Sequence, residues 1–249
     1  MTGESDAGID WEYGRAASDA VEWLLKEGFL KEDDCSMNVA CGRGGFAVPM
    51  SRTVRVLVCV DSSRDSLDIT GQRCAGGCRT ELFQQDWRSY VPARGRYDSC
   101  VMSPSYLCFN METIRRIETV SKRGCAVVFP LEFDYRRLRK GFLQSLGVDA
   151  GFLSMPEFPD PRPFAVWLSE KGRELETRRF QSTVECPDEV FRTAIVRDSV
   201  LHGADEAAAA SMADRYVSKV SRGGTVRYKF SANVVAWNMV RSRSCYGQG

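Results

Sequence analysis

The chain has 249 residues, of which 43% are hydrophobic and 27% are charged, and its formal net charge is +1. These values are typical of a globular protein that is long enough to bury a substantial core as one α/β domain. A net charge so close to zero gives no electrostatic argument for nucleic-acid binding, so we expect no nucleic-acid partner. The basic C-terminal residues, such as Arg241 and Arg243, are interpreted as solvated faces and a tail.

The N-terminal residues, MTGESDAGID, are acidic and lack the apolar stretch of a signal peptide. No apolar run has the length of a membrane span. The ten cysteines are too few for a disulfide scaffold, and several of them lie in apolar runs, where a free thiol packs as a small hydrophobic group. These observations predict a cytoplasmic protein without a membrane partner.

Only one histidine is present, His202 in LHGADEA. A single histidine argues against multi-histidine metal centres and against a histidine-based catalytic triad. The cysteines do not form paired C-x2-C knuckles, so we expect no metal site. We expect His202 to lie at the surface or to cap a helix, away from the strand ends.

Short apolar runs alternate with helical patterns in the first half of the chain, which is typical of βαβ units and a parallel sheet. A helix is predicted from Trp11 to Glu27, with Gly28 as its stop, and the first strand from Ser36 to Ala40. A short helix from about Gly45 follows. The remaining elements, in chain order, are a strand in TVRVLVCVD ending at Asp61, a helix in SSRDSLDITGQRC, a strand in TELFQQD ending at Asp86, a strand in YDSCVMSP, a helix in METIRRIETVSK and a buried strand in GCAVVFPLE.

Beyond residue 132 the pattern is less regular. PFAVWLSEKG has proline at the start and glycine at the end of a helix, which is the usual asymmetry. RELETRRF alternates as a strand does, and PDEVFRTAIVRDS and ADEAAAASMADRYVSKV predict two helices. The last element, GTVRYKFSANVVAWNMV, predicts one long strand or a hairpin.

Three glycines follow the first strand in SMNVACGRGGFAVPM, at positions 42, 44 and 45. Glycine there lets the backbone approach a ligand where a Cβ atom would clash. In a doubly wound sheet, ligands bind beyond the carboxyl ends of the strands, where Asp61 and Asp86 are also expected. The first carboxylate can accept hydrogen bonds from ribose hydroxyls, and the second can reach the exocyclic amine of a base. The pattern therefore predicts a nucleoside site.

The turn is a weak match to the dinucleotide fingerprint. Counted from Gly42, the third glycine of G-x-G-x-x-G is replaced by Ala47, and no Gly-Lys-Ser/Thr follows, which excludes a P-loop. A catalytic Tyr-x3-Lys is also absent, so a nicotinamide-dependent oxidoreductase is a minor alternative. The turn favours an adenosyl ligand without a pyrophosphate.

In MNVACGRGGFAVPMS, VLVCVDSS, FQQDW and YDSCVMSPSY the chain resembles the class I S-adenosylmethionine-dependent methyltransferases. The last segment resembles the S-M-S-P or S-M-T-P motif IV of a small-molecule subset, and the resemblance spans about residues 10–241. It implies a doubly wound, mostly parallel, seven-stranded Rossmann-like sheet with a helical insertion before the last strand. It also implies a single domain, 1–249, with an N-terminal helix in 10–34, a cofactor-binding half at 35–131, a substrate-side half at 132–249 and the insertion at about 187–221.

The resemblance implies S-adenosylmethionine as the cofactor and assigns its contacts by position. Gly42 and Gly44 pass under the methionine part, Asp61 holds the ribose, and Asp86 faces the adenine amine with Trp87 flanking the ring. The implied cofactor-binding residues are Asn38, Ala40, Cys41, Gly42, Gly44, Asp61, Ser62, Asp86, Trp87 and Ser103. Ser103, Pro104 and Tyr106 are the candidates for lining the gap between the cofactor's methyl group and the acceptor.

Two positions depart from the family's pattern: Asn38 replaces an acid and Ala40 replaces a glycine. Asparagine lacks the charge that orders the turn and helps to hold the cofactor's ammonium group, and the Ala40 methyl group adds bulk beside the cofactor. These departures leave open a second hypothesis, a non-catalytic or degenerate methyltransferase-like module that binds the cofactor or acts as a regulator.

The acceptor is expected to be a small molecule, and neither its reacting atom nor the oligomeric state follows from the sequence. No general base stands out near the strand ends, which favours an acceptor that is already nucleophilic, such as a thiolate, an amine or a metal-bound group. SPSY is also similar to the D/N-P-P-Y turn of amino-directed methyltransferases, although Ser103 and Ser105 replace its polar first residue and its second proline. The helices between 187 and 221 are expected to shape the acceptor pocket.

Overall fold

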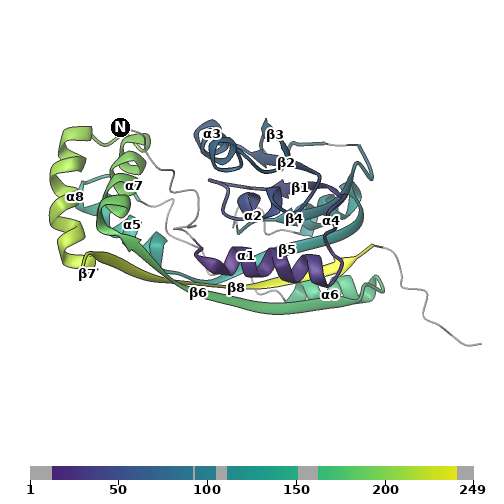
Figure 1. Ribbon diagram of the computed structural model, residues 1–249. Coiled ribbons are helices and arrows are strands. Elements are labelled where there is room, and N and C mark those ends of the chain that lie inside the picture. Colours follow the sequence, from purple (N-terminus) through teal and green to yellow (C-terminus); the bar gives the residue numbers. More distant parts are fainter. Residues whose placement is uncertain (1–12, 92, 105–110, 151–161, 240–249) are drawn as a thin grey trace, which may run out of the picture.

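The structure is a computed structural model that describes residues 13–91, 93–104, 111–150 and 162–239 (Figure 1). One sheet with the strand order β3-β2-β1-β4-β5-β8-β6 forms its centre. The parallel strands are β1 (Cys35–Val39), β2 (Val56–Asp61), β3 (Arg79–Gln84), β4 (Tyr97–Met102) and β5 (Ser121–Phe133). Strand β8 (Thr225–Asn238) runs antiparallel between β5 and β6 (Leu175–Pro187). The predicted doubly wound, mostly parallel α/β sheet is confirmed.

Helices cover both faces of this sheet. One face carries α1 (Arg15–Lys26), α2 (Ala47–Ser51) and α3 (Arg64–Arg73), and the other carries α4 (Met111–Val120) and α6 (Arg162–Glu170). In β2, Leu57 and Cys59 pack into the first core, whereas Val58 and Val60 pack into the second. Burial on both faces explains why this strand is an unbroken apolar run in the sequence.

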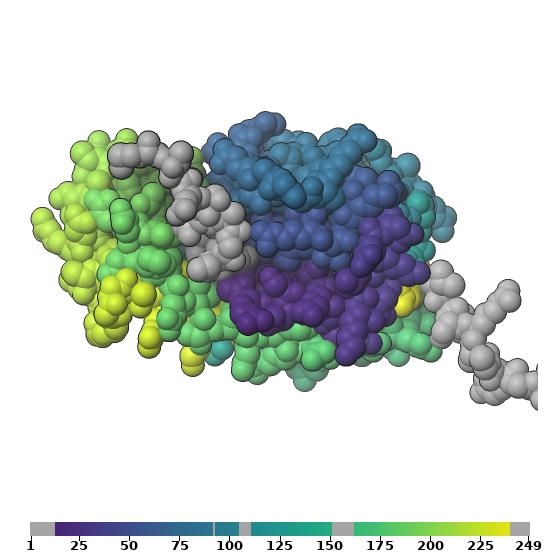
Figure 2. All heavy atoms as spheres, viewed as in Figure 1, coloured from purple at the N-terminus to yellow at the C-terminus, as the bar shows by residue number. Residues whose placement is uncertain are grey.

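Three more helices gather at one end of the long strands, at the left of Figure 1: α5 (Asp134–Ser145), α7 (Asp188–Leu201) and α8 (Glu206–Val220). They enclose a third core with the ends of β6 and β8, in which Phe142, Phe191 and Tyr228 are buried. In the space-filling view α7 and α8 form a green to yellow lobe beside the blue half of the chain that carries β1 to β3 (Figure 2). The sheet thus supports two groups of helices with a gap between them at the carboxyl ends of β1 and β2.

Several element boundaries differ from the predictions, and two elements were not predicted; strand β6, for example, continues to Pro187 instead of ending at Phe180. The first helix begins at Arg15, because Gly14 takes a left-handed conformation with φ of 55° in the turn before it. Strand β3 ends at Gln84, two residues before Asp86. Helix α5 was not expected, because its segment DYRRLRKGFLQS is dominated by charged residues and buries few apolar ones. A two-residue strand, β7 (Ser221–Arg222), adds an eighth strand to the seven that were predicted.

In the described ranges no helix has both the length and the apolar character needed to cross a membrane.

Candidate functional site

The glycine turn after β1 takes the shape that its residues suggested. Ala40, Gly42 and Gly44 have φ angles of 52°, 54° and 91°, all left-handed. In the described ranges Ala40 is the only residue other than glycine with such an angle, so it carries strain of about 1–2 kcal/mol. At Gly44 a Cβ atom would stand 3.2 Å from the Thr70 hydroxyl of α3, whereas at Gly42 it would meet no described residue within 4 Å. Gly44 therefore permits close helix packing, and Gly42 faces open space.

Asp61, at the carboxyl end of β2, is joined directly to this turn. One carboxylate oxygen accepts a hydrogen bond from the Gly42 amide at 2.8 Å, and the other accepts one from the Ser63 amide at 2.9 Å. Each carboxylate oxygen can accept two hydrogen bonds, so Asp61 retains capacity for a ligand hydroxyl. The Gly42 carbonyl, in contrast, accepts from Thr70 at 2.8 Å. The two predicted ligand-binding features thus form one hydrogen-bonded unit.

Asn38 has a clear structural role on β1. Its side chain is fully buried, and its amide nitrogen donates to the Val101 carbonyl at 3.0 Å and to the Ser103 hydroxyl at 2.9 Å. Ser103 lies just beyond the end of β4 and can also donate to the Asn38 carbonyl oxygen, at 3.2 Å. A carboxylate in this place could not donate to Val101. Asn38 therefore cross-links β1 to the end of β4, and the Ser103 side chain is buried beside it.

The remaining predicted cofactor residues are more scattered. Asp86 is exposed in the turn after β3, where Arg88 holds it through hydrogen bonds that lower the pKa of its carboxyl group. Trp87 is buried against Tyr90, with ring centroids 5.6 Å apart. Ser62 is exposed, and the Cys41 side chain is buried beneath the turn. Tyr106 lies outside the described residues.

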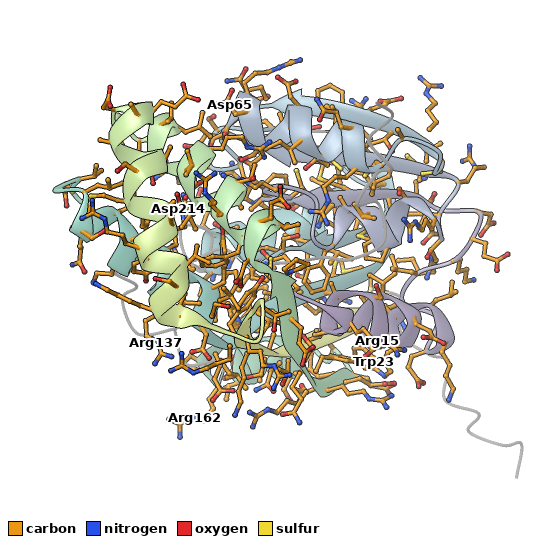
Figure 3. The ribbon with its side chains drawn as sticks, turned by 60° about the vertical axis from the view of Figure 1, so that its left-hand side comes forward. Arg15, Trp23, Asp65, Arg137, Arg162 and Asp214 are labelled. Atoms are coloured by element: carbon orange, nitrogen blue, oxygen red, sulfur yellow. The ribbon has the colours of Figure 1, made fainter. Side chains whose placement is uncertain are left out.

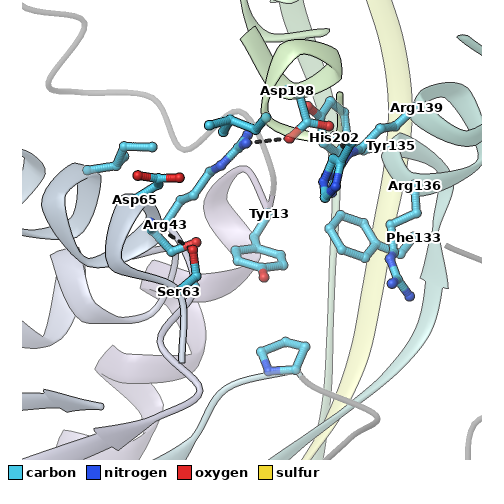
Figure 4. Close-up of a pocket in the computed structure, with 15 residues that line it drawn as sticks. Tyr13, Arg43, Ser63, Asp65, Phe133, Tyr135, Arg136, Arg139, Asp198 and His202 are labelled. Carbon is cyan, nitrogen blue, oxygen red and sulfur yellow. Dashed lines mark hydrogen bonds and ion pairs between the residues drawn. The ribbon is translucent and has the colours of Figure 1, made fainter. Parts of the chain in front are cut away.

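A cleft with a volume of about 400 Å³ opens between the glycine turn, the start of α3 and the helices α5 and α7 (Figure 4). Of the predicted site residues, Gly42 and Pro104 line it. Asp61, Asp86 and Trp87 are not among its lining residues. A ribose beside Asp61 and an adenine ring beside Asp86 and Trp87 therefore stay predictions. The glycine turn and the start of α3 contribute Arg43 and Ser63, and α5 and α7 contribute charged side chains that the sequence did not assign to the site.

A charged cluster spans this cleft. The carboxylate of Asp198, on α7, forms ion pairs with Arg43 of the glycine turn and with Arg139 of α5 (Figure 4). The Asp198 side chain is 1% exposed, so these pairs are shielded from water. Because Arg43 stands in the turn itself, the cluster links the glycine turn directly to helix α7.

His202 joins this cluster from the end of α7. Its Nε2 atom lies 2.9 Å from the Arg139 guanidinium, which donates to the unprotonated ring nitrogen. Burial, and then the positive charge of Arg139, lower the pKa of His202. The expectation that His202 caps a helix is confirmed, since it is the C-cap of α7. The expectation that it lies away from the strand ends is wrong, because it lines the cleft.

Aromatic side chains form another wall of the cleft. Tyr13, Phe133 and Tyr135 all line it, with centroid distances of 5.4 Å between Tyr13 and Phe133 and 6.2 Å between Phe133 and Tyr135. Tyr13 also packs edge-on against Phe230 at 4.7 Å, so the wall is anchored in the core. The wall places aromatic side chains next to the charged cluster, with Tyr13 and Tyr135 largely buried.

One sequence signal could have revealed part of this site. On α7, Phe191, Ile195 and Asp198 follow the i, i+4, i+7 spacing of a buried helix face. An acid at a position where the pattern expects an apolar residue indicates a buried, paired carboxylate. No local pattern indicates its partners, because Arg43 lies 155 residues away.

The described parts of the chain contain no cluster of three or more side chains that could hold a metal ion.

No family model and no curated protein matches the sequence. Solved structures do match. A Bacillus halodurans protein provisionally assigned as a methyltransferase has 16% identity and a TM-score of 0.53, covering 88% of this chain and 98% of that one. The YcgJ protein of Bacillus subtilis has 11% identity and a TM-score of 0.53, covering 88% and 97%.

Magnesium protoporphyrin IX methyltransferase from Synechocystis, solved with bound S-adenosylhomocysteine, has 15% identity and a TM-score of 0.51, covering 90% of this chain and 81% of that one. Identities this low establish the fold alone. The chain has the Rossmann-like fold of methyltransferases.

Proposed function

We propose that this protein transfers a methyl group from S-adenosylmethionine to a small-molecule acceptor. The observation that carries the proposal is the bond between the Gly42 amide and the Asp61 carboxylate. It places a glycine turn and a strand-end acid together at the carboxyl ends of adjacent strands, beside a cleft. Ligands of doubly wound sheets bind at this edge, and the fold supports the same assignment.

The residues at this edge fit an adenosyl ligand. None of the described residues lies within 4 Å of a Cβ atom built on Gly42, so a ligand can lie against the backbone there. Asp61 can accept hydrogen bonds from two ribose hydroxyls while it keeps its bonds to the Gly42 and Ser63 amides. A cleft of about 400 Å³ lies within the usual range for small-molecule sites.

When bound, the cofactor supplies a methyl group on a positively charged sulfur atom, so the protein's task is mainly to align the partners. Asp61 and the Gly42 backbone would hold the nucleoside, and the Asn38–Ser103 bond would fix the ends of β1 and β4 beneath it. Pro104 and the aromatic wall would seat the acceptor and exclude water. The helices α5 and α7 would provide the acceptor's side of the cleft.

A second candidate is a methyltransferase-like module that binds the cofactor without catalysis. Two observations favour it. Ala40 holds a strained left-handed conformation where glycine would be relaxed, and the Asp86 carboxylate is engaged by Arg88. Both changes would weaken cofactor binding without removing the Gly42–Asp61 unit.

Calorimetric titration with S-adenosylmethionine, S-adenosylhomocysteine and NAD tests the proposal. We expect both adenosyl ligands to bind, and NAD to bind at least tenfold more weakly, because the turn lacks the third glycine of the dinucleotide fingerprint. If neither adenosyl ligand binds up to millimolar concentration, the proposal is wrong. Transfer of labelled methyl from the cofactor to a low-molecular-weight cell extract then separates the enzyme from the non-catalytic module.

A further inference from the structure

Helix α3 holds two successive carbonyl groups of the glycine turn with its side chains. The Thr70 hydroxyl donates to the Gly42 carbonyl at 2.8 Å, and the Arg73 guanidinium donates to the Arg43 carbonyl at 2.8 Å. Thr70 and Arg73 are three residues apart, so they lie on one face of the helix, and Thr70 is completely buried there. This face of α3 is therefore an interface with the turn.

Gly42 is held at both its amide and its carbonyl group. The amide donates to Asp61 at 2.8 Å, and the carbonyl accepts from Thr70. The second carboxylate oxygen of Asp61 accepts from the amide of Ser63, the N-cap residue of α3, so both bonds connect the glycine to the same helix. Glycine has the widest choice of backbone conformations, so hydrogen bonds and packing must set the left-handed φ of 54° at Gly42. The two bonds therefore restrict both dihedral angles of this residue.

The hydrogen bond from Thr70 also orients the peptide group between Gly42 and Arg43. No peptide bond among the described residues is cis, and in a trans peptide the carbonyl and the following amide point in opposite directions. Because the Gly42 carbonyl points to α3, the Arg43 amide points away from that helix. Both residues line the cleft. Helix α3 thus determines which face of this peptide group a ligand in the cleft meets.

We propose that Thr70 and Arg73 are positioning residues for the adenosyl ligand: they hold the peptide between Gly42 and Arg43 in the orientation that the ligand binds. This inference rests on the proposed function for the identity of the ligand, and on the two side-chain bonds for the ordering of the turn. Neither residue is among those described as lining the cleft, so each acts through a backbone carbonyl of the turn. A turn that is ordered before the ligand arrives lowers the entropy cost of binding.

The first test removes the Thr70 hydroxyl with Thr70→Val, which keeps the shape of the side chain, and measures S-adenosylhomocysteine binding by calorimetric titration. We expect the Kd to rise at least fivefold, and Thr70→Ser, which keeps a hydroxyl, to bind within twofold of the unmodified protein. The matched control is Thr53→Val, because the Thr53 hydroxyl donates to the Pro49 carbonyl at 2.9 Å, beyond the C-terminal end of α2. This control loses a hydrogen bond of the same kind and should leave the Kd unchanged.

The second test follows hydrogen exchange of the Gly42 amide by NMR, without any ligand. We expect exchange at Gly42 to become at least threefold faster in Thr70→Val and in Arg73→Met, relative to the amides of β2, because each variant releases one carbonyl of the turn. Arg64→Met is the control for the arginine variant, since Arg64 lies on the same helix with its side chain 62% exposed. It should not change the exchange rate.

An unchanged Kd in Thr70→Val, or exchange at Gly42 that neither variant accelerates, would overturn the inference. A rise in Kd as large in Thr53→Val as in Thr70→Val would also overturn it, because the effect would then be a general loss of stability. If Thr70→Val does not fold, Arg73→Met decides the question with the same two measurements. Failure of the proposed function is distinguishable: S-adenosylhomocysteine would not bind the unmodified protein, whereas exchange at Gly42 would still support or overturn the positioning of the turn.

Discussion

Replacing Asp198 with asparagine should strongly destabilise the protein. The substitution keeps the size of the side chain but removes the negative charge held between Arg43 and Arg139. Breaking a buried ion pair by removing one partner costs about 3–5 kcal/mol, because the remaining charge stays buried without compensation. Asp198 is 1% exposed, but its two partners are 10% and 19% exposed, so some solvent reaches them. We therefore expect the lower end of the range, about 3 kcal/mol.

Urea unfolding monitored by tryptophan fluorescence measures this loss directly. A destabilisation of about 3 kcal/mol corresponds to a fall in Tm of roughly 6–12 °C for a chain of this size. The control is Asp214→Asn on α8, which removes an ion pair with Arg192 whose side chains are 66% and 38% exposed (Figure 3). That variant should unfold almost as the unmodified protein does, because solvent screens exposed pairs.

The result that would refute this reasoning is a loss below about 1 kcal/mol for Asp198→Asn, which is the range of a surface pair. It would mean that Arg43 and Arg139 find other partners without cost, and that the cluster across the cleft contributes little to holding α7 against the glycine turn. A change in the urea m-value instead of the midpoint would show that the variant alters how much surface unfolds.

Three further predictions concern the site. Asp61→Ala should weaken S-adenosylhomocysteine binding at least tenfold, because it removes the ribose acceptor and a partner of the turn, whereas Asp65→Ala should have little effect; equal losses would contradict the ribose assignment. Ala40→Gly should tighten S-adenosylhomocysteine binding several-fold, because it removes the methyl group beside the ligand; an unchanged Kd would show that this methyl group does not crowd the ligand. The free energy of unfolding should change little, because relief of about 1–2 kcal/mol of backbone strain is offset by roughly 0.4–1 kcal/mol of chain entropy in the unfolded state. His202, the only histidine, should titrate below pH 6.5 by NMR, and its pKa should rise in Arg139→Met. Because the pKa of His202 is lowered in the folded state, the unfolded state binds more protons as the pH falls from about 7, so the free energy of unfolding decreases over that range. His202→Gln should make this decrease smaller.

The sheet was predictable because the burial of each strand determines a pattern of apolar residues that are consecutive in the sequence. Strand β2 buries alternate side chains on opposite faces, Leu57 toward one core and Val58 toward the other, so the sequence shows an unbroken apolar run. Helix α5 was missed for the opposite reason. It covers a small separate core, so a few buried residues such as Tyr135 and Phe142 suffice, and charged residues fill the rest of the helix.

The site was predictable only where its partners are close in sequence or belong to strand ends. Gly42 and Asp61 follow adjacent strands, and their bond results from the topology of the sheet. The cluster of Arg43, Asp198 and Arg139 depends on where α5 and α7 pack, which no local pattern specifies. Asp86 shows a further limit of prediction from sequence. Its position after a strand predicted a contact with a ligand, but its carboxylate accepts a hydrogen bond from the neighbouring Arg88 side chain.

The three long strands have a mechanical consequence. Strands β5, β6 and β8 have 13, 13 and 14 residues and run from the parallel core to the helices on the far side of the cleft. β6 pairs with β8 without a register shift, whereas the pairing of β5 with β8 shifts between Pro130 and Glu132, so the same hydrogen-bonded ribbon of strands carries both walls of the cleft. To open the cleft, this ribbon must twist elastically along its length, so the spacing of the walls is a property of the sheet. A substitution that changes the twist of β8, far from any ligand, would alter the width of the cleft.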